Sequence, residues 1–152
     1  MPEWDDDVQS FLRFWFAGLV EGLESVDAPA RRTILRACGN ACARSYTAEQ
    51  FQQAWQSSIG MADFLRELAR RFPEASYTMT DRNQIQARYN RCACDLARLG
   101  LVTHPLLCDC SAQNLESNFS GALGKPVSVA LESAILRGAE QCCFTVTIEE
   151  EL

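Results

Sequence analysis

The sequence has no hydrophobic run long enough to span a bilayer, and its first residues lack the basic charge of a secretory signal. The longest run of apolar residues and glycine covers positions 14–20, whereas a transmembrane helix needs about 20 such residues. The chain begins with Met-Pro-Glu-Trp-Asp-Asp-Asp, which is acidic, whereas a secretory signal is basic. We therefore expect a cytoplasmic protein that neither crosses a membrane nor is exported.

The sequence is also poor in basic residues and in histidine. Fourteen Lys and Arg residues oppose twenty Asp and Glu residues, and the formal net charge is −6. No basic stripe with interleaved aromatic residues is present, which argues against nucleic acid as a direct partner. The single histidine, His104, precedes Pro105 in a predicted loop, where we expect an exposed imidazole rather than a general base. The chain also lacks a nucleophile elbow and a glycine-rich phosphate loop.

Cysteine, by contrast, is abundant and is not scattered. The eight cysteines form three close pairs and one adjacent pair, namely Cys38/Cys42, Cys92/Cys94, Cys108/Cys110 and Cys142/Cys143. A reducing cytosol keeps thiols free, so the pairs favour metal binding, redox chemistry or packing as small buried hydrophobes over disulfides.

The length of 152 residues predicts one domain, residues 1–152, which divides by hydrophobic period. Residues 1–73 form a helical part. A three-to-four residue period predicts helices over about 6–24, over about 28–44 after an Asp27 cap, from a Thr47/Gln50 capping box onward, and over about 61–72. Pro73 ends the last of these.

Residues 74–152 form a cysteine-rich sheet part. A period of two predicts one hairpin over about 77–89 and a second from strands at about 127–132 and 143–148, with a helix from a Ser111 cap to Gly124 between them. The expected fold is α+β, with the N-terminal helices packed on one face of an antiparallel sheet built from hairpins and one helix before the last hairpin. Continuing the second strand by twos places Arg88, Cys92 and Cys94 on one polar face.

The cysteine pairs of the sheet part are candidate metal ligands. A Cys-x-Cys segment supplies two thiolates, and Cys92/Cys94 and Cys108/Cys110 together could form a four-thiolate zinc site. Buried inert thiols and a redox dithiol are the alternatives, and an iron–sulfur cluster ranks below zinc because the spacing matches no ferredoxin run. Glu132 and Cys143 point to one side of the last hairpin. The candidate metal ligands are therefore Cys92, Cys94, Cys108, Cys110, Cys143 and Glu132.

Two further features concern a ligand pocket and a partner. Cys38 and Cys42 share the apolar stripe of a helix, where core packing is favoured over chelation, and with Arg88 they are candidates to line a pocket. The first helix is rich in apolar residues beyond one stripe, which gives the hypothesis of a homodimer.

The C-terminal half resembles a known family. Leu107-Cys-Asp-Cys-Ser, Gly124-Lys-Pro-Val-Ser-Val, Glu132-Ser-Ala-Ile-Leu-Arg-Gly138 and Cys143-Phe-Thr-Val resemble the 4-vinyl reductase domain family of small-molecule-binding modules over about residues 88–148. The ending is also similar, in looser form, to L-2-amino-thiazoline-4-carboxylic acid hydrolases. The first resemblance implies an antiparallel sheet covered by helices on one side, with a cavity between the layers.

The resemblance also implies a function. Members of this superfamily include sensor domains in which a cysteine, a Glu-x-x-Cys and a later cysteine hold zinc beside a ligand pocket. Glu132 and Cys143 match two of these positions, Cys108 or Cys110 lies near the first, and Ile135 replaces the inner cysteine. We therefore expect a cysteine-rich, zinc-binding module that binds or senses a small molecule. The alternative is a hydrolase in which a metal-bound water or a thiolate attacks a small substrate.

Overall fold

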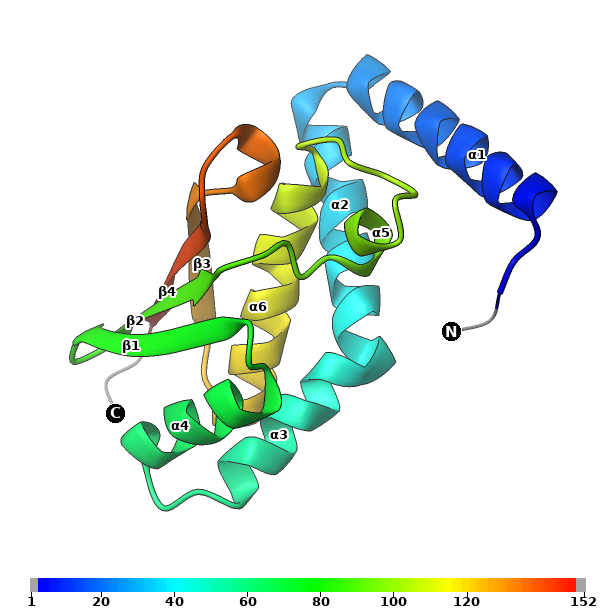
Figure 1. The fold of residues 1–152 in the computed structure, drawn as a ribbon. Coiled ribbons are helices and arrows are strands. Elements are labelled where there is room, and N and C mark those ends of the chain that lie inside the picture. The colour runs from blue at the N-terminus through cyan, green and yellow to red at the C-terminus, as the bar shows by residue number, and fades with distance from the viewer. Residues whose placement is uncertain (1–2, 150–152) are drawn as a thin grey trace.

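The computed structural model describes residues 3–149 and has helices packed on one face of an antiparallel sheet (Figure 1). The helical elements are α1 (Asp6–Ser25), α2 (Ala28–Cys42), the π-helical turn η1 (Ala43–Thr47), α3 (Ala48–Gln56), α4 (Met61–Arg71), α5 (Asp95–Arg98), α6 (Leu107–Leu123) and the 3-10 turn η2 (Ile135–Arg137). The strands are β1 (Ala75–Asp81), β2 (Gln84–Tyr89), β3 (Val127–Ser133) and β4 (Cys142–Ile148). The expected α+β class, with one helix before the last hairpin, is confirmed.

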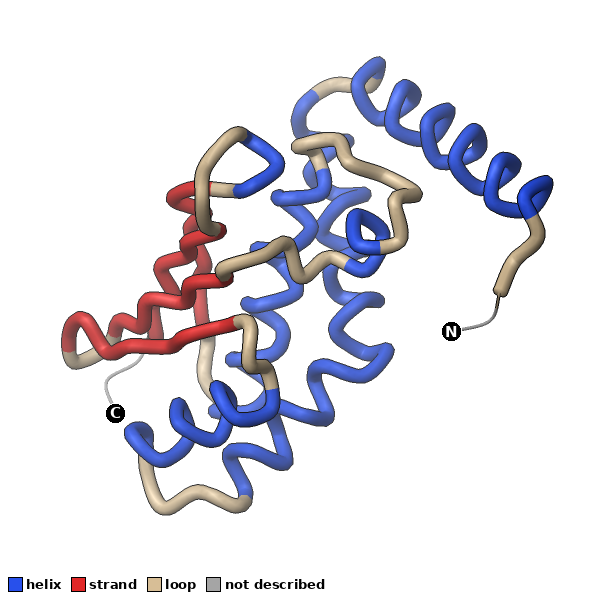
Figure 2. Tube along the Cα trace, viewed as in Figure 1, coloured by secondary structure: helices blue, strands red, loops and turns tan. Residues whose placement is uncertain are grey.

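The sheet has the strand order β1-β2-β4-β3, and all neighbouring strands are antiparallel. Figure 2 shows the strands gathered on one side of the molecule and the helices on the other. The inward side chains of β2 and β4, such as Ile85 and Val146, are completely buried. They pack with Phe119 of α6 and with Phe51 and Phe64 of the neighbouring helices, which makes this layer the main hydrophobic core.

The predicted Asp27 cap of the second helix is confirmed, and the structure adds an Asp5 cap at the first helix. The Asp5 and Asp27 side chains accept hydrogen bonds of 2.8 Å from the backbone N–H groups of Val8 and Ala30, which satisfies donors that helix geometry leaves free. No helix within residues 3–149 is both long and apolar enough to cross a membrane.

Two predicted helix starts are wrong. Thr47 is itself helical (φ −72°, ψ −36°) and makes no cap, because η1 joins α2 to α3 without a break. The last long helix begins at Leu107 rather than after Ser111, and the Ser111 hydroxyl donates to the Leu107 carbonyl one turn earlier. Cys108 and Cys110 therefore lie in the first turn of α6 instead of in the loop before it.

The predicted continuation of the second strand to Cys94 is also wrong. β2 ends at Tyr89, which pairs with Ala75 on one side and with Cys142 on the other, and these are the first residues of β1 and β4. Beyond Tyr89 the backbone makes one more bond, from the Asn90 N–H group to the Glu74 carbonyl at 3.1 Å, and the ladder then stops because both neighbouring strands begin opposite Tyr89. Cys92 and Cys94 consequently lie in a loop that leads to α5.

Candidate functional site

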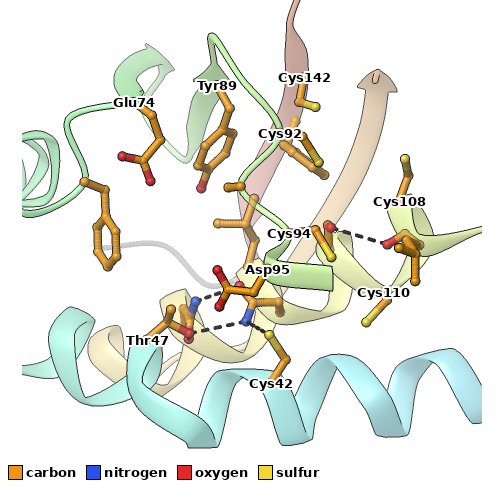
Figure 3. Close-up of a pocket in the computed structure, with 18 of the residues that line it drawn as sticks. Cys42, Thr47, Glu74, Tyr89, Cys92, Cys94, Asp95, Cys108, Cys110 and Cys142 are labelled. Carbon is orange, nitrogen blue, oxygen red and sulfur yellow. Dashed lines mark hydrogen bonds between the residues drawn. The ribbon is translucent and has the colours of Figure 1, made fainter. Parts of the chain in front are cut away.

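A cavity of about 130 Å³ lies between the inner face of the sheet and the helical layer. Six of the eight cysteines line it, namely Cys42, Cys92, Cys94, Cys108, Cys110 and Cys142. Figure 3 shows Glu74 and Tyr89 at one end and Cys108 and Cys110 at the other, with Cys92 and Cys94 between them. The cavity therefore has two ends of different chemistry, called here the aromatic end and the thiol end.

The aromatic end is a chain of rings that meet edge to face. The Phe144 and Tyr89 ring centroids are 5.9 Å apart, those of Tyr89 and Tyr77 are 6.4 Å apart, and those of Tyr77 and Phe51 are 6.4 Å apart, with interplanar angles of 90°, 84° and 89°. Phe72 extends the chain at a centroid distance of 5.6 Å from Phe51, in a tilted contact with an interplanar angle of 41°. This arrangement is favoured by the ring quadrupoles and gives the cavity a preformed aromatic wall.

Two hydroxyl groups add polarity to the aromatic end. The Tyr77 and Tyr89 hydroxyl oxygens are 3.4 Å apart, and either can donate to the other. Desolvation raises the pKa of Tyr89 to about 12 and raises that of Tyr77 well above its ordinary value. Both phenols are therefore neutral at physiological pH and can donate to a hydroxyl or carbonyl group of a ligand.

The thiol end is assembled from four separate segments of the chain. Cys92 and Cys94 come from the loop after β2, Cys142 begins β4, and Cys42 ends α2. Cys108 and Cys110 come from the first turn of α6.

A close approach of two helices at Gly39 places Cys42 near α6. A Cβ atom at Gly39 would lie 2.6 Å from the Cys110 carbonyl oxygen and 2.7 Å from the Gln113 Cβ. Only glycine allows this contact, since such distances are shorter than van der Waals contact.

A hydrogen-bond network holds α6 against η1 beneath the cavity. Thr47 donates to the Asn118 Oδ1 atom at 3.1 Å, and Asn118 donates to the Asn114 Oδ1 atom at 3.0 Å. Asn114 in turn donates to the Thr47 hydroxyl at 3.3 Å and to the Cys42 sulfur at 3.4 Å. Since Asn118 is buried, these bonds avoid the cost of an unsatisfied polar group and fix one wall of the site.

Burial keeps the Cys108 and Cys110 thiols protonated. Desolvation is the main cause that raises the pKa of Cys108 to about 11 and that of Cys110 to about 12. The nearby thiols Cys142 and Cys92 act in the same direction on Cys108, while Arg137 opposes them. Since the thiolate rather than the thiol is the nucleophile, neither cysteine is activated for catalysis at neutral pH.

Cys42 and Cys94 follow the same trend. Desolvation raises the pKa of both thiols, and the Cys94 and Asp95 charges raise the pKa of Cys42 further. Cys42 thus lies within electrostatic reach of Cys94 on the opposite wall, and Cys94 within reach of Cys92 on the same loop. Within residues 3–149, however, no three His, Cys, Asp or Glu side chains are grouped closely enough to hold a metal ion as they stand.

The other predicted site residues lie elsewhere. Glu132 and Cys143 do share one side of the last hairpin, as predicted, but that side is the outer face of the sheet, where they line a separate surface pocket with Arg88. The Glu132 carboxylate accepts a 3.1 Å hydrogen bond from the Thr145 hydroxyl. Arg88 therefore does not line the main cavity. Metal binding by Glu132 and Cys143 stays a prediction, and it would concern the outer-face pocket and not the cavity.

Two further residues also lie outside the cavity lining. Cys38 and Cys42 are both exposed on α2, so the core packing favoured from the sequence is wrong for this pair, and of the two only Cys42 lines the cavity. The partly exposed His104 lies 3.4 Å from a Glu24 carboxylate oxygen and accepts a hydrogen bond from the Leu106 N–H group. The single imidazole is thus engaged by α1 and its own loop rather than by the cavity.

Several cavity residues were not predicted from the sequence. The strand alternation that places Phe144 on the apolar face also places Cys142 there, and this signal was available in the sequence. Phe72 and Glu74 lie in the short linker between α4 and β1, and Tyr89 is the last residue of β2. No local spacing indicates that this linker and the end of β2 line one cavity.

No family model and no curated protein matches the sequence. Among solved structures, the chain is similar to trafficking protein particle complex subunit 3 from Naegleria fowleri covalently bound to palmitic acid. That match has a TM-score of 0.60 and 14% identity, and it covers 97% of this chain and 99% of the other. The chain is also similar to the phenol-responsive sensory domain of the transcription activator PoxR with phenol, with a TM-score of 0.54 and 9% identity, over 93% of this chain and 73% of the other. These similarities show a shared fold.

Proposed function

We propose that this protein is a small-molecule-binding module whose ligand is about the size of one aromatic ring and occupies the cavity between the sheet and α6. The volume of about 130 Å³ supports this size, since an engineered apolar cavity of about 150 Å³ in another protein binds benzene. The edge-to-face wall suits an aromatic ligand. The Tyr77 and Tyr89 hydroxyl pair favours a ligand that carries one hydroxyl group, such as a phenol.

The two structural relatives contain ligands of different kinds. One is bound covalently to palmitic acid, and the other contains phenol. A long acyl chain is larger than the cavity of this protein, so the volume favours a compact ring. We include a sensing role in this proposal, because the sequence resembles the 4-vinyl reductase domain family, which includes sensor domains.

We also propose that the thiol end binds zinc through Cys92, Cys94, Cys108 and Cys110. All four side chains line one cavity, and four thiolates satisfy the tetrahedral preference of Zn²⁺. The loop that carries Cys92 and Cys94 would have to close toward α6, because no three sulfurs are grouped tightly in the described residues. A bound cation would favour the thiolate forms and so offset the desolvation that now raises the pKa of Cys108 and Cys110.

A hydrolase that uses a cysteine nucleophile receives less support. Such an enzyme needs a lowered thiol pKa or an adjacent base. The pKa values of four cavity thiols are instead raised, namely those of Cys42, Cys94, Cys108 and Cys110. The single histidine is engaged outside the cavity.

Calorimetric titration with phenol tests the proposed cavity ligand. Ser111 lines the cavity on α6, and Ser111→Phe would fill the space with a ring. The matched control is Ser128→Phe on the exposed outer face of β3. We expect saturable phenol binding by the wild type and by Ser128→Phe, and at least a tenfold loss for Ser111→Phe. Absent binding to the wild type, or equal binding by both variants, would contradict the proposal.

A further inference from the structure

Helix α1 extends away from the rest of the molecule (Figure 1) and has two apolar faces, of which one is covered. Its Val20 side chain packs against Leu101 and Val102 in a second, smaller cluster. On the other face Phe11, Phe14 and Trp15 are 61%, 78% and 55% exposed. Large aromatic residues exposed together on one helix indicate a surface that another molecule covers.

This exposed stripe changes in size along the helix. At about 100° per residue, Phe11, Trp15, Gly18 and Gly22 fall along the centre of the stripe, with Val8, Phe14 and Leu19 beside it. The N-terminal half of the stripe is therefore bulky and the C-terminal half is flat. No atom lies within 4 Å of a Cβ built at Gly18 or Gly22, so no other part of this chain covers the flat half.

We propose that a second copy of this chain covers the stripe, with the two α1 helices antiparallel. A two-fold axis between residues 16 and 17 places Phe11 over the partner subunit's Gly22 and Trp15 over the partner subunit's Gly18. Each bulky half then packs into the other subunit's flat half, which is the self-complementarity that an isologous dimer requires. Residues of alternating size also let side chains of one helix enter the grooves of the other.

The charge of α1 disfavours a lipid surface as the occupant. Helices that lie on membranes carry basic residues on their polar face and are attracted to anionic lipids. α1 contains four acids and one base, Asp6, Asp7, Glu21, Glu24 and Arg13. Anionic lipid would repel this helix. At about 100° per residue Asp7 lies at the N-terminal end of the stripe and the other three acids lie outside it, so a second copy that covers the stripe leaves those three in water.

Sedimentation equilibrium of the wild type and of two variants tests this dimer. We expect a mass of twice 17.0 kDa at micromolar concentrations. Gly18→Leu/Gly22→Leu fills the flat half and should weaken association at least tenfold, although it makes the stripe more apolar. The control Ala17→Leu adds the same type of side chain at an exposed position outside the stripe and should leave the dimer intact. Helix formation is not at risk, since Leu is a better helix former than Gly.

Three results would overturn the proposal. One is a monomeric wild type over the whole concentration range. Another is association of Gly18→Leu/Gly22→Leu that is as strong as that of the wild type, because this would indicate non-specific apolar contact. The third is binding of the wild type to phosphatidylcholine or phosphatidylserine vesicles that Phe14→Glu abolishes while the protein in solution stays monomeric.

Discussion

Cys142 and Cys143 are neighbours in the sequence and belong to different sites. Cys142 is buried on the inner face of the sheet, accepts a 3.4 Å hydrogen bond from the Ile135 N–H group and lines the cavity. Cys143 is partly exposed on the outer face and lines a surface pocket with Arg88 and Glu132. The inner face thus combines thiols with aromatic rings, and the outer face combines a thiol with charged groups.

This difference follows from strand geometry alone. Successive side chains of a strand point to opposite faces, so two adjacent cysteines cannot serve one site unless a bulge separates them. The helices cover only one face of the sheet, which makes that face apolar and leaves the other polar. Each prediction below contrasts a change in the layer between the sheet and the helices with a matched change on the outer face of the sheet.

Phe119→Ala should give the largest effect. Phe119 is completely buried between the sheet and the helices, with ring centroids 5.1 Å from Phe51 and 6.1 Å from Tyr77. Its truncation should lower the free energy of unfolding by about 3–5 kcal/mol. Thr147→Ala on the outer face should change it by less than about 0.5 kcal/mol. Urea unfolding measures both, and similar losses would contradict the assignment of the core to one face.

Removal of a cavity cysteine should abolish stoichiometric zinc binding. The wild type purified under reducing conditions without a nickel resin should contain about one zinc per chain, measured by plasma mass spectrometry. Cys110→Ser should lower the zinc affinity at least about 100-fold, since losing a ligand costs at least as much as losing an outer-shell partner. Cys143→Ser should retain the metal. Zinc that depends on Cys143 but not on Cys110 would move the site to the outer face.

The stability of the metal-free protein should fall above pH 9. The pKa of Cys108 rises from 9.0 to about 11 on folding and that of Cys110 to about 12. Above pH 9 the unfolded chain loses these protons first, so the contribution is complete below pH 9 and is lost as the pH rises toward 12. Cys110→Ala should reduce this slope in thermal unfolding between pH 8 and 11, and Cys143→Ala should not. Equal slopes would show that Cys110 titrates normally.

Tyr89→Phe should give the smallest effect. The loss of one hydroxyl that bonds to phenol should weaken phenol binding by about 1 kcal/mol, or about fivefold, and should leave toluene binding unchanged. Arg88→Ala, at the next position but on the outer face, should alter neither titration. If Arg88→Ala weakens phenol binding more than Tyr89→Phe does, phenol binds on the outer face.

Much of the fold follows from local pattern. Asp5 and Asp27 cap helices because their side chains can reach free N–H groups, and the alternation of Val127 to Leu131 and of Phe144 to Ile148 fixes which side of each strand is buried. The ends of helices and strands were less predictable where contacts with distant segments determine them. β2 stops at Tyr89 because the partner strands begin opposite to it, and no residue after Tyr89 signals this.

The candidate site was predicted only in part. Close spacing indicated a shared site for the pairs Cys92/Cys94 and Cys108/Cys110, and the structure places all four thiols around one cavity. Cys42 was a pocket candidate from its place on a helix stripe, but its position beside these four thiols depends on the contact of Gly39 with α6, which spacing does not indicate. The aromatic wall also depends on packing between distant segments.

Nuclear Overhauser measurements between phenol and the labelled protein test the central claim most directly. Phe144 and Cys143 are adjacent on β4, but only Phe144 lines the cavity. We expect contacts from the phenol ring protons to the Phe51, Tyr89 and Phe144 side chains and none to Arg88, Glu132 or Cys143. Contacts confined to the latter three, or no contacts at saturating phenol, would show that the cavity is not the ligand site.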